Sequence, residues 1–143
     1  MKQPGEILII KTKMNCYCCS GREFEDCCRL FISGKAKPAT AEELMRSRYS
    51  AYATVEVDYI LRTTHPSTRK FHEPRTIEQW AKTSCWQKLE IISTTKGNST
   101  DKEGTVEFKA HYLDADHRPQ IHHENSTFRK ELGKWFFVDG KVL

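Results

Sequence analysis

Cysteine is the residue type whose number and spacing in this chain most clearly indicate chemistry. The sequence holds six cysteines in 143 residues, and five of them lie between Cys16 and Cys28, in the segment CYCCSGREFEDCC. Thiolates are soft ligands that bind Zn²⁺ in tetrahedral sets of four, and two close pairs joined by a short turn can supply such a set. So dense a cluster in a cytosolic protein is more typical of a metal site than of disulfides.

The candidate zinc ligands form two pairs, Cys16 with Cys18 and Cys27 with Cys28. A segment of about twenty residues cannot bury enough apolar surface to order itself, whereas zinc binding to such peptides contributes roughly 10–16 kcal/mol. We therefore predict that these four residues bind Zn²⁺ and that the ion orders the segment. The alternative is a metal-free set of reduced or redox-active thiols. A separate hypothesis is that the fifth thiol, Cys19, acts as a redox or zinc-stress sensor.

A second group of side chains could line a pocket between helices and sheet. Its members are Tyr49, Tyr52, Trp80, His111, His123 and Glu124. The aromatic residues are equally compatible with a packed core, and the polar ones with a solvent-facing sheet surface. Alternation along a strand puts His122 and Glu124 on one face and His123 on the other, and register across strands cannot be determined from the sequence. Because no phosphate loop or nucleophile motif is present, the sequence specifies no reaction.

Helix signals occupy the first part of the chain after the cysteines. Thr40 followed by Glu43 is a capping box, which predicts a helix to about Ala53. A second helical stretch is expected at residues 56–62. The two prolines of HPSTRKFHEPR predict a loop, after which Thr76 and Gln79 predict another capping box and a short helix.

Strand signals fill the remainder of the chain. Residues 86–95 are rich in β-branched types, residues 105–113 and 121–129 alternate, and residues 135–138 form a last apolar run. Short turns between successive strands predict an antiparallel meander. Helices followed by strands indicate an α+β fold, with three helices packed on one face of a curved four-stranded antiparallel sheet.

The cysteine segment resembles a known motif. Its spacing, C-x-C-x-S-G-x(5)-C-C, is similar to the SEC-C motif of the SecA translocation ATPase, where the usual form is CPCGSGKKYKxC followed by His or Cys. The resemblance puts the two cysteine pairs on the four zinc-ligand positions. Tyr17 replaces the usual proline and Cys19 the usual glycine, and a non-glycine residue at positive φ costs on the order of 1 kcal/mol.

The rest of the chain resembles the YchJ-like family of SEC-C proteins. The similarity rests on PATAEELMRSRYSAYATVEVDYILRTTHPSTR, VEFKAHY, HENSTF and KWFFVDG. It implies a cone-shaped, nuclear transport factor 2-like domain preceded by a four-cysteine zinc knuckle. The domain prediction is a tail at residues 1–15, a SEC-C-type zinc motif at 16–34 and an α+β cone domain at 38–143, with Met14 as an alternative translation start.

Composition bounds the remaining predictions. The formal charge is +4, which is weak grounds for a nucleic-acid partner, and no apolar run approaches the about 20 residues of a membrane helix. We expect a cytoplasmic protein whose knuckle binds a protein or ribosomal partner, as the SEC-C motif of SecA contacts the SecB chaperone. The alternative is a small-molecule-binding or enzymatic domain that uses the cone pocket. Partner, substrate and oligomeric state are not encoded in any recognisable pattern.

Overall fold

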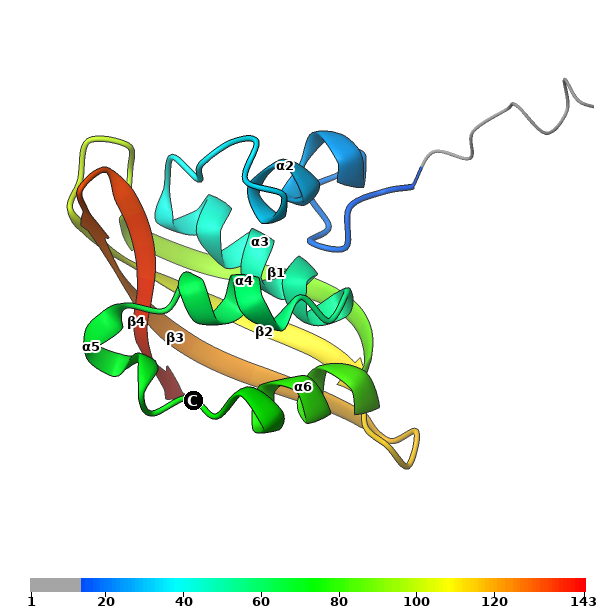
Figure 1. Ribbon diagram of the computed structural model, residues 1–143. Coiled ribbons are helices and arrows are strands. Elements are labelled where there is room, and N and C mark those ends of the chain that lie inside the picture. The colour runs from blue at the N-terminus through cyan, green and yellow to red at the C-terminus, as the bar shows by residue number, and fades with distance from the viewer. Residues whose placement is uncertain (1–13) are drawn as a thin grey trace, which may run out of the picture.

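A four-stranded antiparallel sheet forms one layer of the molecule and a set of helices forms the other (Figure 1). The computed structural model describes residues 14–143. The strands are β1 (Cys85–Lys96), β2 (Glu103–Leu113), β3 (Pro119–Glu131) and β4 (Lys134–Val142), and their spatial order is the sequence order. Each strand pairs antiparallel with the next. The predicted α+β fold and meander are confirmed.

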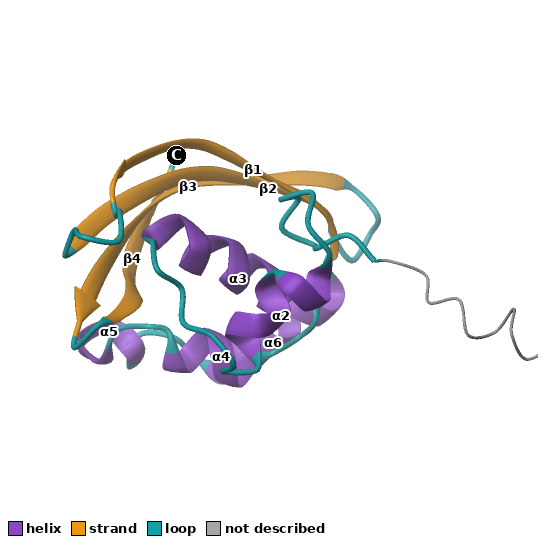
Figure 2. Cartoon of the chain, turned by 90° about the horizontal axis from the view of Figure 1, so that it is seen from above, coloured by secondary structure: helices purple, strands orange, loops and turns teal. Residues whose placement is uncertain are grey.

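The helices lie on one side of this sheet, which curves over them in Figure 2. They are η1 (Phe24–Asp26), α2 (Cys28–Ile32), α3 (Ala41–Ala53), α4 (Val57–Arg62), α5 (Pro66–Arg69) and α6 (Pro74–Thr83). The longest, α3, lies between the sheet and the N-terminal segment, so it can take part in both halves of the molecule (Figure 1).

The capping box predicted at the start of α3 is present. The Thr40 hydroxyl accepts a hydrogen bond from the Glu43 backbone N–H at 3.1 Å, and the Glu43 carboxylate accepts one from the Ala39 N–H at 3.1 Å. Thr40 thereby satisfies one of the N–H groups that the first helical turn leaves unpaired. The helix ends at Ala53, as predicted.

Two predictions between α4 and the sheet were wrong. The segment predicted as a loop contains α5, because Pro66 occupies the first helical position and the His65 ring caps the Ser67 N–H at 3.1 Å. Helix α6 begins at Pro74 instead of after Thr76, for the same reason: proline pre-sets a helical φ and needs no N–H partner there.

One continuous cluster of buried apolar side chains joins the N-terminal segment, the helices and the concave face of the sheet. Val106, Phe108 and Ala110 alternate inward along β2, as predicted, and Phe128 of β3 is fully buried. Phe24 and Ile32 of the N-terminal segment belong to the same cluster, and burial of each is worth about 1.5–3 kcal/mol.

Within residues 14–143, no helix is both long enough and apolar enough to cross a membrane. The prediction of a tail at residues 1–15 falls almost wholly outside the described part of the chain.

Candidate metal centre and cavity

A tight hairpin-like loop presents the first cysteine pair. The Cys16 N–H donates to the Arg22 carbonyl at 2.8 Å, and the Phe24 N–H donates to the Met14 carbonyl at 2.9 Å. The chain reverses at Gly21, which has a φ of 86° that glycine adopts without steric cost. These contacts turn both Cys16 and Cys18 toward the second pair.

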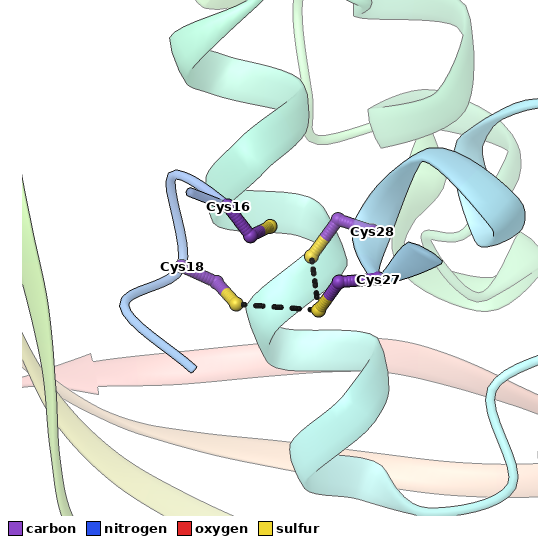
Figure 3. A group of neighbouring side chains, drawn as sticks. All are labelled: Cys16, Cys18, Cys27 and Cys28. Atoms are coloured by element: carbon purple, nitrogen blue, oxygen red, sulfur yellow. Dashed lines mark hydrogen bonds between the residues drawn. The ribbon is translucent and has the colours of Figure 1, made fainter. Parts of the chain in front are cut away.

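The second pair comes from the start of α2. Cys27 is the residue that precedes the helix and Cys28 is its first residue, so their neighbouring thiols emerge from a rigid turn. Figure 3 shows the four side chains converging from the loop and from α2, in front of α3.

The four sulfur atoms lie at the separations that a tetrahedral metal site needs. All four are within 4.8 Å of one another, with 3.7 Å between the sulfurs of Cys18 and Cys27 and 4.0 Å between those of Cys27 and Cys28. A regular tetrahedron with Zn–S bonds of about 2.3 Å has S–S edges of about 3.8 Å. The residues present therefore fit a divalent metal of zinc's size and preference.

Burial distinguishes these thiols from the other two cysteines. Cys18 and Cys28 have no exposed surface, and Cys16 and Cys27 retain 4% and 7%. Cys19 and Cys85 are exposed and are not members of the cluster. A site closed by four buried protein ligands leaves no coordination position for substrate, which is the arrangement of structural metal sites.

The thiols perturb one another strongly. Hydrogen bonds from Cys18 and Cys28 lower the pKa of Cys16, whereas hydrogen bonds to Cys16 and Cys18, together with burial, raise the pKa of Cys28. Burial raises the pKa of Cys27. Four sulfurs this close cannot all carry a negative charge, and a bound divalent cation is the species that lets them do so.

Two polar side chains of α3 connect the cluster to the cone domain. The Ser50 hydroxyl lies 3.5 Å from the sulfur of Cys16, and Nη1 of Arg46 donates to the Cys18 carbonyl at 2.7 Å. Ser20 adds a hydroxyl 3.3 Å from the sulfur of Cys27. Such outer contacts orient ligands, and α3 and the knuckle loop together supply them. Neither Ser50 nor Arg46 could be linked to the cysteines from the sequence, because both are distant from them along the chain.

Cys19 adopts the positive φ that its place in the motif suggested. Its φ is 65°, in the left-handed region where glycine is the usual residue. The same conformation turns the thiol away from the cluster and toward the Tyr17 carbonyl, at 3.6 Å. The fifth thiol therefore does not compete for a ligand position in this conformation.

A cavity of about 420 Å³ lies between the helices and the concave face of the sheet. Four of the six residues predicted for a pocket line it: Tyr49, Tyr52, Trp80 and Glu124. Trp86 and Ser126, which the sequence also suggested for the pocket, line it as well, and further lining residues include Arg48, His72, Phe108 and His122.

His111 and His123 do not line this cavity. They project from the opposite face of the sheet, where His111 lies 3.1 Å from the Glu90 carboxylate and His123 lies 2.7 Å from that of Glu107. The physical reason is strand alternation, since Glu124 faces the cavity and its neighbour His123 must face away. His122, two positions from Glu124, is the β3 histidine that faces the cavity.

Glu124 is the centre of a small polar network in the cavity wall. One of its oxygens lies 2.9 Å from Nε2 of His122, and the other accepts a short hydrogen bond from the Ser126 hydroxyl. Burial by itself raises the pKa of Glu124, but the bonds from His122 and Ser126 outweigh it and hold the pKa below its usual range. Gly140 of β4 packs directly against this carboxyl group.

Arg48 is the only arginine or lysine among the described residues that line the cavity. It is 6% exposed, and its Nη1 donates to the Ile60 carbonyl at 2.8 Å and to the Thr63 hydroxyl at 2.7 Å. Its guanidinium carbon lies 4.5 Å from the centre of the Phe137 ring. Burial lowers the pKa of Arg48, yet an arginine remains charged at neutral pH.

Comparison with known proteins agrees with this architecture. A family model described as the YchJ middle NTF2-like domain matches residues 40–140. A UPF0225 protein of Geobacter sulfurreducens is 45% identical over 125 residues, which cover 87% of this chain and 77% of the relative. A UPF0225 protein of Haemophilus influenzae is 41% identical over 138 residues, covering 96% of this chain and 84% of the relative.

Solved structures extend the similarity to the cysteine segment. The solution structure of a SEC-C motif containing protein from Rhodopseudomonas palustris superposes with a TM-score of 0.83 at 37% identity, over 91% of this chain and 99% of the other. The crystal structure of a SEC-C motif containing protein from Psychrobacter arcticus gives a TM-score of 0.76 at 33% identity, over 94% and 84% of the two chains.

Proposed function

The chain belongs to the YchJ-like family, and we propose that its four-cysteine cluster binds Zn²⁺ as a structural ion. The bound ion makes the knuckle (residues 16–34) a rigid binding surface for a protein partner. The main support for zinc binding is that four buried sulfur atoms lie within 4.8 Å of one another. The proposal requires a reducing compartment such as the cytoplasm, because only thiolates bind the metal.

Zinc is the metal that the ligand set favours. Four thiolates in a closed tetrahedral arrangement suit Zn²⁺ or an iron–sulfur centre, whereas Mg²⁺ and Ca²⁺ prefer oxygen ligands. The four residues come from a single short segment with sulfur separations near 4 Å, which suits one ion at the centre of the set. When bound, the ion would offset half of the charge of four thiolates and would cross-link the loop to α2.

The surface part of the proposal rests on what the knuckle leaves exposed. Tyr17 is 36% exposed although its ring packs edge-on against Phe24 at 5.2 Å, and the preceding Met14 is 50% exposed. An aromatic side chain held in one orientation on a rigid loop is a good contact for a protein partner, because little conformational entropy remains to be lost on binding. The SEC-C resemblance supports the same role.

Metal content of the purified protein tests the zinc assignment. We expect native mass spectrometry of protein isolated without added metal to show one zinc ion per chain, and Cys27→Ser to lose it. Cys19→Ser is the matched control, since this exposed thiol lies outside the cluster, and it should retain the ion. Unmodified protein that carries no metal, or that carries iron with inorganic sulfide, would contradict the proposal.

The partner surface is tested separately. We expect Tyr17→Ala to keep its zinc and to lose the proteins that cross-link to the unmodified chain in cell extract. Capture of the same proteins by the unmodified chain and by Tyr17→Ala would refute the surface, and recovery of ribosomal RNA in place of specific proteins would refute the choice of partner.

A further inference from the structure

The cavity between helices and sheet has walls suited to a flat aromatic molecule. Trp80 and Trp86 contact each other edge-on at 5.2 Å, Tyr52 lies 5.2 Å from Trp80, and Tyr49 lies 5.8 Å from Trp86. A volume of about 420 Å³ falls within the range of small-molecule pockets. Aromatic edges and faces of this kind stack with a planar ring more favourably than with an aliphatic chain.

Arg48 brings to this apolar space a positive charge that the more distant Glu124 carboxylate offsets only in part. It forms no ion pair within 4.0 Å with any residue of the described chain, and every hydrogen bond found there uses Nη1 alone. The other two guanidinium nitrogens, Nε and Nη2, form no hydrogen bond within the described part of the chain. Within residues 14–143, every fully buried side-chain nitrogen or oxygen has a hydrogen-bond partner, so Nε and Nη2 must each keep some accessible surface. Because Arg48 lines the cavity, we take the accessible surface of these two nitrogens to face it.

Nε and Nη2 lie on one edge of the guanidinium plane and present two parallel N–H donors. This fork matches the two oxygens of a carboxylate. Contact with Phe137 and the bonds from Nη1 to the end of α4 hold the group in place, so little side-chain freedom is lost when a ligand binds.

Glu124 is not the carboxylate that binds the Nε–Nη2 edge of Arg48. Its two oxygens are engaged by His122 and Ser126, and it lies beyond ion-pair distance from Arg48. Its negative charge on the β3 wall disfavours a second acidic group on the ligand. We infer that the cavity binds a small aromatic monocarboxylate, with the carboxylate on the Nε–Nη2 edge of Arg48 and the ring among Trp80, Trp86 and the two tyrosines.

The three tryptophans provide an internal reporter for this inference. Trp80 and Trp86 line the cavity, whereas Trp135 lies outside it and donates its indole N–H to the Ala39 carbonyl at 3.0 Å. Titration of the full chain with trans-cinnamate, followed by ¹H–¹⁵N NMR, should shift the indole resonances of Trp80 and Trp86 saturably and leave that of Trp135 in place.

A charge series on one ring system separates carboxylate recognition from apolar binding. We expect cinnamamide and cinnamylamine to bind at least about ten-fold more weakly than cinnamate, a loss of about 1.4 kcal/mol. Equal affinity for the three probes, no saturable shift at millimolar cinnamate, or a shift of Trp135 alone would overturn the inference. This comparison uses the unmodified protein, so it holds whether or not any variant folds.

Variants then assign the effect to Arg48. Arg48→Met should abolish the preference for cinnamate over cinnamamide, and Arg48→Lys should reduce it, because lysine keeps the charge and loses the fork. Arg62→Met is the matched control, since Arg62 also donates to a backbone carbonyl, that of Ile32 at 2.7 Å, but lies outside this cavity. An unchanged preference in a folded Arg48→Met protein would contradict the assignment.

Discussion

At the scale of single residues, one glycine limits what the cavity wall can tolerate. A Cβ built on Gly140 would overlap the carboxyl group of Glu124, whose oxygens already bond His122 and Ser126. The backbone of β4 thus approaches the β3 wall closely enough to fix the Glu124 side chain. A glycine is needed at position 140 because there is no room for a side chain. The backbone conformation does not require glycine, since Gly140 is not one of the residues with a positive φ.

We predict that Gly140→Ala destabilises the protein by about 1–3 kcal/mol, the usual cost of overpacking, measured by urea unfolding. The cost should largely disappear in a Glu124→Ala background, because the overlapping group is then absent. This double-mutant cycle isolates the contact. Equal costs in the two backgrounds would show that the glycine matters for another reason.

Cys19 shows at the same scale how one backbone angle decides a role. Its φ of 65° points the thiol to the Tyr17 carbonyl and leaves the four-cysteine cluster complete without it. The exposed thiol remains available to oxidants, so the redox role is a separate hypothesis that the zinc assignment does not exclude.

At the scale of elements, α3 connects the two candidate sites. One side of the helix contacts the knuckle through Arg46 and Ser50, and another lines the cavity with Arg48, Tyr49 and Tyr52. Arg46 and Arg48 point in different directions because they are two positions apart on a helix with 3.6 residues per turn. The helix therefore links the position of the knuckle to one wall of the cavity.

We predict that Arg46→Met loosens the knuckle without loss of the cone fold. The substitution removes the bond to the Cys18 carbonyl at 2.7 Å and the ion pair with Glu42 at 3.0 Å, and keeps the apolar stem. A hydrogen bond from a charged donor contributes about 1.5–3 kcal/mol, reduced here because the Arg46 side chain is 23% exposed.

The measurement for Arg46→Met is hydrogen exchange of the knuckle amides in zinc-loaded protein, which should accelerate. Arg129→Met is the matched control, because Arg129 is an exposed arginine of β3 whose charged group lies 3.8 Å from Glu131. Equal exchange in the two variants would show that Arg46 does not hold the knuckle.

At the scale of the whole molecule, the knuckle and the cone domain share one apolar core. Phe24 and Ile32 belong to the same buried cluster as Leu44 of α3 and Phe128 of β3. The four-stranded sheet and its helices nevertheless contain most of that cluster, so most of the shared core lies outside the knuckle.

We predict that a zinc chelator, with reductant present, disorders the knuckle and leaves the cone domain folded at lower stability. If the cluster binds zinc as proposed, chelation removes the cation that offsets the thiolate charge, and Phe24 and Ile32 lose their anchor. In ¹H–¹⁵N spectra the knuckle resonances should move to random-coil positions while those of β2 and β3 stay dispersed. Complete unfolding, or a knuckle unaffected by chelation, would contradict this division.

The sequence by itself determined the features whose physical cause is local. Four cysteines within one short segment indicate a metal site before any tertiary contact forms, and Thr40 with Glu43 sets the start of α3 through adjacent backbone groups. The alternation of β2 likewise identified its buried face, because successive side chains of a strand must point to opposite sides.

Only the tertiary structure decided which side chains meet across the fold. Alternation along β3 puts His122 and Glu124 on the same face of the strand. The register between β2 and β3 sets Glu124 opposite the inward-facing Phe108, so His122 and Glu124 face the helices and His123 faces away from them. Arg48 was likewise not assignable to the cavity from the sequence, since its surroundings come from the end of α4 and from Phe137 of β4. Strand register and helix placement are set by packing summed over the whole core, which no short stretch of sequence contains.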